Sequence, residues 1–322
     1  MPAVAPLYEC IADDLKKVCQ IVEHELFSDL PAINELCSYV RQYQGKMLRP
    51  ALLLLSAEAC GGITNEHLTL AAVVEMVHMA TLVHDDVLDE AEMRRRCPTI
   101  NCLQGNEAAI LLGDYLISHA FYLCNSIDSQ FASRKIGATT NILCEGELQQ
   151  LYHRGDSGLS VEQYIKIITH KTAFMIGTCC LLGAHYSSAD DQTKASLEQY
   201  GLDVGVAFQM TDDVLDIIGS EERMGKTLGR DLEKKKPTLP VIHCLAEADE
   251  ELCNELKEVL SKTPFDRERV HKLLESTDSI NYSLTIARRY VDSAIECLAG
   301  IPVSEARDTL DRMARLIVER EQ

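Results

Sequence analysis

The spacing of the proline residues constrains the fold of this chain more than any other feature. Of its 322 residues, none is proline between Pro50 and Pro98, and none is proline between Pro98 and Pro237. Because proline breaks the interior of a helix, such long proline-free stretches permit long helices.

Apolar residues recur three and four positions apart, as one buried face of a helix requires. The pattern runs from Leu68 to His84 and again from Leu284 to Leu298. No segment alternates in steps of two between hairpin turns, so a sheet is not expected. Turn-forming residues separate the helical stretches at Gly61-Gly62, Gly155–Gly158, Ser187–Asp191, Gly219–Gly229 and Ser261–Pro264. We therefore predict an all-α protein in which residues 1–322 form a single domain.

Composition excludes several classes of protein. With 46% apolar and 25% charged residues the chain is not disordered, and its net charge of −19 argues against a nucleic-acid partner or a coat on anionic membranes. The thirteen cysteines contain no C-x-x-C pair, which predicts free, mostly buried thiols in a reducing compartment. Residues 1–10 show no secretory signal, and no apolar stretch approaches the length of a membrane span. We expect a cytoplasmic protein without a transmembrane segment.

The pentapeptide Asp-Asp-Val-Leu-Asp occurs twice, at Asp85–Asp89 and at Asp212–Asp216, each time after an apolar segment. On a helix its first and fifth residues share a face, and the second lies beside them. One such cluster would be read as a solvated acidic face. Two copies favour a cation instead, because like charges four residues apart repel each other. Carboxylate ligands without histidine or cysteine indicate Mg²⁺.

Basic segments follow both clusters. Arg94–Arg96 comes after the first, and Gly225–Asp231 and Lys234–Lys236 come after the second. A diphosphate needs this combination, with a metal ion on some of its oxygens and arginine or lysine on the others. No Walker A loop is present, so a nucleoside triphosphatase is not indicated.

With these motifs the chain resembles the trans-isoprenyl diphosphate synthases. The residues around the first aspartate cluster resemble those of the medium- and long-chain members. The family patterns DDxxD…RR and FQxxDDxLD…GKxxGxD…KxTLP match Asp85–Arg95 and Phe208–Pro240. Five further motifs match in the expected order, at Gly45–Pro50, Glu75–His78, Gly113–Tyr115, Gly146–Gln150 and Lys171–Ala173. The resemblance implies a helical bundle of the isoprenoid synthase type with a central cavity, usually as a homodimer.

The resemblance also implies a reaction and a role for each matched residue. The enzyme would be a prenyltransferase that joins isopentenyl diphosphate to an allylic diphosphate in the E configuration. Three Mg²⁺ ions would be coordinated by Asp85, Asp89 and Asp212, with Asp86, Asp213 and Asp216 in supporting or water-mediated roles. The allylic diphosphate would be held by Arg94, Lys171, Lys226 and Lys236, and isopentenyl diphosphate by Lys46, Arg49, His78 and Arg95. Thr172 and Gln209 would stabilise the allylic cation, which makes Asp85, Asp89, Lys171, Thr172, Gln209 and Asp212 the candidate catalytic residues.

A few positions lie outside these assignments. Gln44, Met47, Arg96 and Cys97 depart from the family pattern, and we expect them to tune binding. His84 matches no family role and is expected to pack in the core, and Asp114 and Gln150 are expected to support the site.

Product length in the family depends on the bulk just before the first aspartate cluster. Ala80 and Thr81 stand five and four residues before Asp85, and neither is large. This predicts a heptaprenyl to decaprenyl product, with octaprenyl central. A farnesyl or geranylgeranyl synthase remains the alternative function if Met76 or residues near Phe121 close the product tunnel. A class I terpene cyclase or a regulatory synthase subunit fits less well, because both aspartate motifs are kept in the synthase form.

Overall fold

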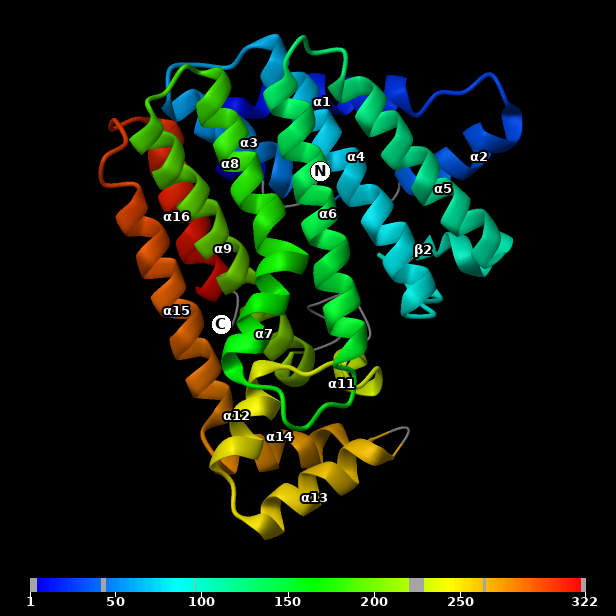
Figure 1. Ribbon diagram of the computed structural model, residues 1–322, viewed down its shortest axis with the longest axis vertical. Helices are drawn as coiled ribbons and strands as arrows, with labels where there is room; N and C mark the ends of the chain where they lie inside the picture. Colours follow the sequence, from blue (N-terminus) through cyan, green and yellow to red (C-terminus); the bar gives the residue numbers. More distant parts are fainter. Residues whose placement is uncertain (1–4, 42–44, 96, 220–228, 263–264, 320–322) are drawn as a thin grey trace. The chain divides into compact units, whose positions relative to one another are not determined.

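The computed structural model describes residues 5–41, 45–95, 97–219, 229–262 and 265–319, and most of them are helical. The described residues group into two compact units. Unit 1 comprises Met1–Thr140, Met175–Glu198 and Leu298–Met313, and unit 2 comprises Asn141–Phe174, Gln199–Cys297 and Ala314–Gln322. The prediction of an all-α fold is confirmed (Figure 1).

The helices of unit 1 come mainly from the N-terminal part of the chain. They are the 3₁₀ segment η1 (Ala5–Ile11), α1 (Ala12–Glu25), α2 (Pro31–Arg41), α3 (Leu48–Ala59), α4 (Asn65–Leu88), α5 (Ile100–Cys124) and nearly all of α8 (Phe174–Tyr186). Three further helices contribute residues to both units, namely α6 (Gln130–Tyr152), α9 (Asp191–Ile218) and α16 (Glu305–Glu319).

Unit 2 contains the remaining elements. They are α7 (Val161–Ile168), the π-helical turn η2 (Thr169–Ala173), α11 (Arg230–Glu233), α12 (Leu239–Glu247), α13 (Glu250–Ser261), α14 (Arg267–Ser276) and α15 (Ser279–Cys297). Within this unit α12 packs against α7, α14 and α15, and α13 packs against α14 (Figure 1). Leu256 of α13, Val270 and Leu274 of α14 and Val214 of α9 are among the buried side chains of one apolar cluster in this unit.

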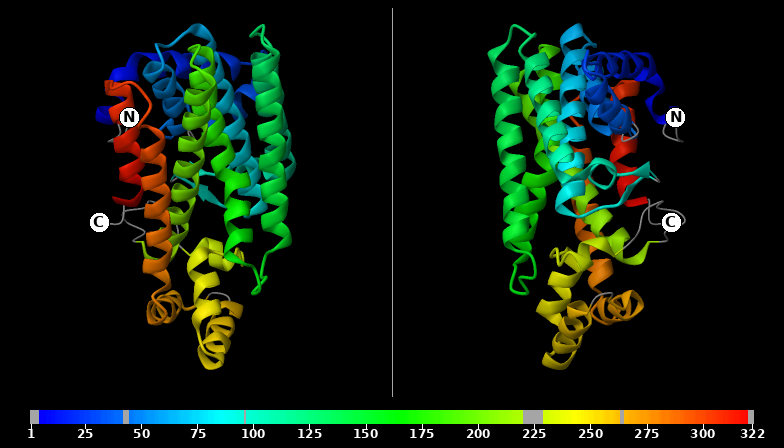
Figure 2. Two further views of the ribbon diagram at one scale, coloured as in Figure 1. Left: turned by 60° about the vertical axis from the view of Figure 1, so that its left-hand side comes forward. Right: turned by 90° about the vertical axis from the view of Figure 1, so that its right-hand side faces the viewer.

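Unit 1 is built around α4, which lies along α5 and also packs against α1 and α3 (Figure 2). Leu52–Leu55 of α3 are buried without interruption, as in a helix enclosed by neighbours on all sides. A Cβ atom on Gly183 of α8 would lie 2.3 Å from the carbonyl oxygen of Leu53. The glycine therefore permits the backbones of α3 and α8 to approach closely.

A short antiparallel pair departs from the purely helical expectation. β1 (Met93–Arg94) pairs with β2 (Cys97–Pro98) between the end of α4 and the start of α5. Arg95, at the turn between the two strands, has a φ of 51°, which is the left-handed conformation that tight hairpin turns require. The hairpin was missed because two-residue strands are too short to produce an alternating pattern.

Two helices are long and apolar enough to cross a membrane by length and composition alone, which corrects the expectation that no stretch approaches that length. They are Asn65–Leu88 and Val161–Tyr186, whose most apolar windows are 67% and 78% buried inside the protein. Core helices of globular proteins have these properties. The burial therefore assigns both to the interior rather than to a lipid bilayer.

All thirteen cysteines are free thiols, as predicted. Five of them are buried, six are half-buried and two are exposed, so the expectation that most are fully buried was too strong.

Candidate active site

The first aspartate cluster lies at the C-terminal end of α4. Asp85 and Asp86 are in the last helical turn, and Asp89 caps the helix with its backbone N–H 2.8 Å from the carbonyl oxygen of Asp85. Asp86 is only 1% exposed, whereas Asp85 and Asp89 are half-buried. Neighbouring residues on a helix differ by about 100° in direction, so one carboxylate of the pair faces the protein and the other faces outward.

Arg94 binds the buried carboxylate of this cluster. Its Nε donates to both oxygens of Asp86 at 2.9 and 3.0 Å, and its Nη2 lies 2.8 Å from Oδ1. The β1–β2 hairpin carries Arg94 back to α4 and so places a predicted diphosphate ligand beside the first cluster.

Unit 1 also contains all four residues predicted to bind isopentenyl diphosphate. Burial, followed by the positive charges of Arg49 and the hairpin arginines, holds the pKa of His78 well below its usual value, so the imidazole is neutral at pH 7. Burial raises the pKa of Glu75, and the guanidinium groups of Arg49 and Arg95 oppose that rise. Lys46 is exposed beside Gly45, the residue against which the Arg95 guanidinium packs. Positive charge is thus concentrated in this part of unit 1, on Lys46, Arg49 and Arg95. The buried carboxylate of Glu75 lies among these cations.

His84 packs against α5, as expected, although it remains half-buried. Its Nε2 lies 3.1 Å from the carbonyl oxygen of Ile110, and a Cβ atom on Gly113 would collide with the ring. Asp114, which is mostly exposed, has a carboxylate oxygen 3.7 Å from the same nitrogen. The Gly113-Asp114 motif thus packs against His84 of α4.

The second aspartate cluster lies near the C-terminal end of α9 in unit 2. Asp213 and Asp216 are 5% and 2% exposed, and Asp212 is half-buried. Burial, together with the nearby carboxylate of Asp231, raises the pKa of Asp213 to about 8. The backbone N–H of Asp231 donates to Asp216 Oδ2 at 3.1 Å. As in the first cluster, some carboxylates are used by the protein and one faces outward.

Asp213 belongs to a chain of hydrogen bonds that reaches Thr172. Gln209 Nε2 donates to Asp213 Oδ1 at 2.8 Å, and Thr172 Oγ1 donates to Gln209 Oε1 at 2.9 Å. Tyr164 of α7, which is 1% exposed, donates its hydroxyl to Asp213 Oδ2 at 2.7 Å. The structure therefore brings Thr172, Gln209 and Asp213 together in one chain of hydrogen bonds and adds Tyr164 to it.

Lys171 and Thr172 stand in the π-helical turn η2. Such turns insert an extra residue into a helix and occur often at functional sites. A Cβ atom on Gly146 of α6 would lie 2.5 Å from the backbone nitrogen of Lys171, so the two backbones are in contact there. That approach lets Lys171 Nζ reach Glu147 Oε1 at 2.6 Å and Gln150 Oε1 at 3.0 Å.

Lys236 follows α11 and is tied to the second cluster through Asp231. Its Nζ lies 3.5 Å from Asp231 Oδ1, and its backbone N–H donates to the carbonyl oxygen of the same residue. Asp231 in turn donates its backbone N–H to Asp216. Lys226 lies outside the described residues.

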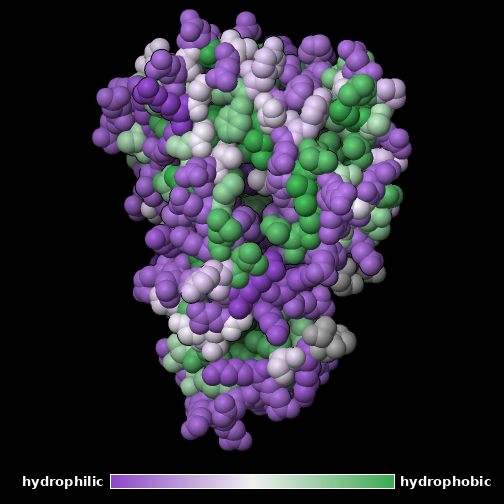
Figure 3. Space-filling view, turned by 45° about the vertical axis from the view of Figure 1, so that its right-hand side comes forward, coloured by the Kyte–Doolittle hydropathy of each residue, from purple (hydrophilic) through white to green (hydrophobic). Residues whose placement is uncertain are grey.

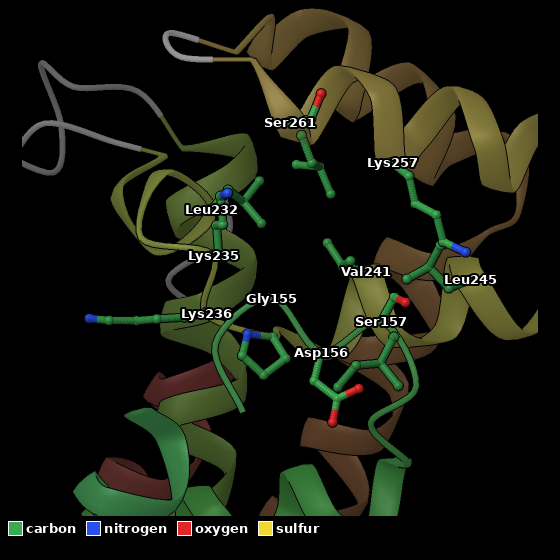
Figure 4. A pocket seen from close by; sticks show the side chains of 13 residues that line it. Gly155, Asp156, Ser157, Leu232, Lys235, Lys236, Val241, Leu245, Lys257 and Ser261 are labelled. Carbon is green, nitrogen blue, oxygen red and sulfur yellow. The ribbon is translucent and has the colours of Figure 1, made fainter. Parts of the chain in front are cut away.

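A pocket of about 260 Å³ in unit 2 lies beside the segment that carries Lys236. Leu232, Val241 and Leu245 give it an apolar lining, while the ammonium group of Lys236 extends away from these side chains (Figure 4). None of the six aspartates lines this pocket. Among the described residues that line it, Lys236 is the predicted diphosphate ligand.

The carboxylates of the two clusters suit Mg²⁺, which prefers oxygen ligands. Among the described residues, no three histidine, cysteine, aspartate or glutamate side chains converge into a closed metal site. Mg²⁺ does not require such a cage, because it usually keeps several waters and takes one or two carboxylates together with substrate phosphates. The half-buried Asp85, Asp89 and Asp212 suit that manner of binding.

Three residues of these networks had no role in the predictions from sequence, namely Tyr164, Glu147 and Asp231. Tyr164 carried a usable signal, since it falls on the buried face of an amphipathic helix, where its hydroxyl needs a partner. Asp231 and Glu147 lay inside matched motifs, but only the folded chain shows that they contact lysines.

Clustered carboxylates, lysines and arginines on the ends of long helices define a class of protein, the all-α enzymes that act on diphosphates with the help of divalent metal. Comparison with known proteins gives the family. A family model described as Polyprenyl synthetase matches residues 30–277, and the chain belongs to this family.

Several relatives match along nearly the whole chain. The octaprenyl diphosphate synthase of Escherichia coli (strain K12) is 32% identical over 317 residues, which cover 98% of both chains. Component 2 of the heptaprenyl diphosphate synthase of Bacillus subtilis (strain 168) is 33% identical, over 97% of this chain and 90% of that protein. The structure of a polyprenyl synthase from Caulobacter crescentus CB15, complexed with calcium and isoprenyl diphosphate, matches with a TM-score of 0.93 at 31% identity, covering 99% of this chain and 98% of that one. These matches confirm the predicted fold and the predicted enzyme class, a trans-prenyltransferase of the polyprenyl diphosphate synthase kind.

Proposed function

We propose that this enzyme condenses isopentenyl diphosphate with an allylic diphosphate and makes an all-E polyprenyl diphosphate of heptaprenyl to decaprenyl length. The observation that carries the proposal is the division of the two aspartate clusters by burial. Asp86, Asp213 and Asp216 are buried and bonded to protein donors, whereas Asp85, Asp89 and Asp212 are half-buried. We propose that the second set binds metal, as the family resemblance implies.

We propose that Asp85, Asp89 and Asp212 hold Mg²⁺, three ions in all when the allylic diphosphate is bound, with Asp86, Asp213 and Asp216 supporting them. Bound Mg²⁺ would neutralise the charge that develops on the pyrophosphate as it leaves. Support comes from the hard oxygen donors of both clusters and from the Caulobacter crescentus structure, which contains a divalent metal with an isoprenyl diphosphate.

Cationic side chains would hold the two substrates in place. Arg94, Lys171, Lys226 and Lys236 would bind the allylic diphosphate, and Lys46, Arg49, His78 and Arg95 would bind isopentenyl diphosphate. His78 would donate a hydrogen bond to the substrate from its imidazole ring.

The reaction would begin with ionisation of the allylic C1–O bond. The oxygen atoms of Thr172 and Gln209 would stabilise the resulting allylic cation. The alkene of isopentenyl diphosphate would then attack that cation, and a proton would pass to the released pyrophosphate. No enzyme nucleophile is needed.

The assignment of product length rests on the residues before the first cluster. Ala80 is fully buried and small, and the hydroxyl of half-buried Thr81 donates to the carbonyl oxygen of His78 at 2.8 Å, within its own helix. Neither residue places bulk where the family closes its product tunnel. The octaprenyl and heptaprenyl synthases among the relatives support the same range.

The proposal is tested by supplying isopentenyl diphosphate, Mg²⁺ and each allylic primer in turn, and measuring the release of pyrophosphate. We expect turnover that needs both diphosphates and stops when a chelator removes the metal. Pyrophosphate release without isopentenyl diphosphate would indicate a cyclase. Turnover that appears only with a second protein would indicate a subunit of a two-component synthase.

We further propose that the enzyme is a cytoplasmic homodimer that pairs through α5. Exposed apolar side chains lie along this helix, including Ile110, Leu111 and Tyr122, and Leu111 is 68% exposed. Figure 3 shows apolar side chains, in green, gathered on a face on the side that carries α5. Free thiols throughout the chain fit a reducing compartment.

The dimer is tested by sedimentation of Leu111→Glu beside Val303→Glu, which places the same charge at an apolar residue that is 82% exposed. We expect the wild type and the Val303 variant to sediment as dimers and the Leu111 variant as a monomer. A wild type that sediments as a monomer would contradict the proposal.

A further inference from the structure

We propose that Tyr164 is a positioning residue that sets the direction of the hydrogen-bond chain from Asp213 through Gln209 to Thr172, so that oxygen lone pairs face the allylic cation. The inference rests on the proposed function, because the cation is the intermediate of that reaction. It adds a residue of α7 that lies outside every family motif found in the sequence.

The chain begins at Tyr164. Its hydroxyl lies in the interior, 2.7 Å from Asp213 Oδ2. A buried phenol requires a hydrogen-bond partner, and Asp213 Oδ2 accepts the hydroxyl hydrogen of Tyr164. This bond restrains the carboxyl group of Asp213 from rotating.

The restrained carboxylate then fixes the amide of Gln209. Asp213 Oδ1 accepts a hydrogen bond of 2.8 Å from Gln209 Nε2, so the nitrogen of the amide faces Asp213. The carbonyl oxygen of Gln209 must therefore point the other way. It receives the hydroxyl of Thr172 at 2.9 Å.

As a result, the hydrogen bond at the Thr172 end of this hydrogen-bond chain has a fixed direction. The one hydroxyl proton of Thr172 is committed to Gln209, so the lone pairs of its oxygen are left for a ligand. A carbocation is stabilised by such lone pairs and is opposed by an O–H or N–H hydrogen that points toward it. Release of Asp213 would let the amide turn over and free the Thr172 proton.

The backbone keeps the members of the chain in contact. A Cβ atom on Gly205 would lie 2.4 Å from the Cα of Ala173, so α9 touches η2 one helical turn before Gln209. The π-helical turn carries Thr172 at that contact. Small changes in Tyr164 would therefore act through hydrogen bonding rather than through movement of these helices.

The test compares Tyr164→Phe with Tyr186→Phe. The control tyrosine also donates one hydroxyl hydrogen bond of 2.7 Å, to Ser129 Oγ, and belongs to no site motif. We expect kcat of Tyr164→Phe to fall about tenfold, with KM for both diphosphates within about twofold of the wild type. The control should keep the wild-type kcat, and the two variants should lose similar amounts of thermal stability. Equal kcat in both variants would overturn the proposal, whereas an inactive wild type would overturn the proposed function instead.

A double-mutant cycle separates positioning from general loosening of the site. In a Thr172→Ala background the end of the chain is absent, so Tyr164→Phe should change kcat by less than about twofold. A purely structural role would give the full tenfold loss in both backgrounds, and that result would overturn the proposal.

The same chain can be tested without altering Tyr164, should its phenylalanine variant fail to fold. Gln209→Glu keeps the size of the side chain but sets a second carboxylate against Asp213. We expect kcat to fall by at least about a hundredfold. A loss smaller than threefold would overturn the proposed polarity of the chain.

Discussion

Adjacent aspartates in the two repeated pentapeptides differ in their burial and in their hydrogen-bond partners. Asp86 is enclosed and bonded to Arg94, whereas Asp85 beside it is half-buried and directed elsewhere. In the second cluster Asp213 is enclosed and Asp212 is half-buried. The protein thus bonds Asp86 and Asp213 to its own side chains, whereas the carboxylate beside each of them is half-buried.

Removal of an outward carboxylate tests this division at the scale of a single residue. We expect Asp85→Asn to lower kcat by at least about a thousandfold at saturating Mg²⁺, because a charged metal ligand is lost. Asp114→Asn is the matched control, since this mostly exposed aspartate lies 3.7 Å from His84 and is assigned no ligand. Its activity should stay within about twofold of the wild type. Comparable losses in both variants would contradict the assignment.

The sequence indicated which types of residue form the site. It did not indicate which of the aspartates are bonded to other side chains of the protein. The repeat and its spacing were enough to predict carboxylates and cations around a diphosphate. The bonds of Tyr164 to Asp213 and of Glu147 to Lys171 join residues far apart in the chain. Such pairs depend on how the helices pack, and helical periodicity does not specify that packing.

Helix α4 is held at its N-terminal end by a buried histidine. The backbone N–H of Thr64 donates to His67 Nδ1 at 2.9 Å, and His67 Nε2 lies 2.9 Å from the carbonyl oxygen of Gly183, which makes the ring a neutral Nε2–H tautomer. Burial lowers the pKa of His67 below its usual value. Protonation would place a hydrogen on Nδ1 and break the bond to Thr64.

This histidine predicts a pH dependence of stability. Because the pKa is lower in the folded state, the unfolded chain binds the proton more readily, so the stabilisation is present above the unfolded value of 6.5 and is lost as pH falls through the folded pKa. We expect the thermal unfolding midpoint to fall more steeply below pH 6.5 in the wild type than in His67→Gln. Parallel curves for the two proteins would show that His67 does not contribute.

Two glycines in helices predict opposite effects of the same substitution. Gly183→Ala would drive a methyl group into the backbone of α3 and should destabilise the protein by about 1–3 kcal/mol. Gly137 of α6 has no atom within 4 Å of an added Cβ, so Gly137→Ala should stabilise by up to about 1 kcal/mol through helix propensity. Thermal unfolding midpoints that move in opposite directions would confirm both, and equal shifts would contradict the close packing of α3 and α8.

Five helix ends could be predicted from turn chemistry. Helices α3, α6, α8, α9 and α13 end at Ala59, Tyr152, Tyr186, Ile218 and Ser261, next to the predicted turns. The π-helical turn at Thr169–Ala173 could not be predicted, because the apolar pattern passes through it without a glycine or proline.

For the whole molecule, the expected size of the product depends on small side chains near the first cluster. Thr81→Phe adds bulk at a half-buried position and should shorten the main product by several isoprene units. Chain length is the appropriate readout, because a variant that is merely less stable makes less product of the same length. An unchanged product distribution would show that Thr81 does not line the tunnel.

The most direct measurement is the size of the product that the wild-type enzyme makes from isopentenyl and farnesyl diphosphates with Mg²⁺. We expect a polyprenyl diphosphate between heptaprenyl and decaprenyl, centred on octaprenyl, because neither Ala80 nor Thr81 blocks elongation. A reaction that stops at farnesyl or geranylgeranyl diphosphate, with no longer product even after extended incubation, would contradict this expectation.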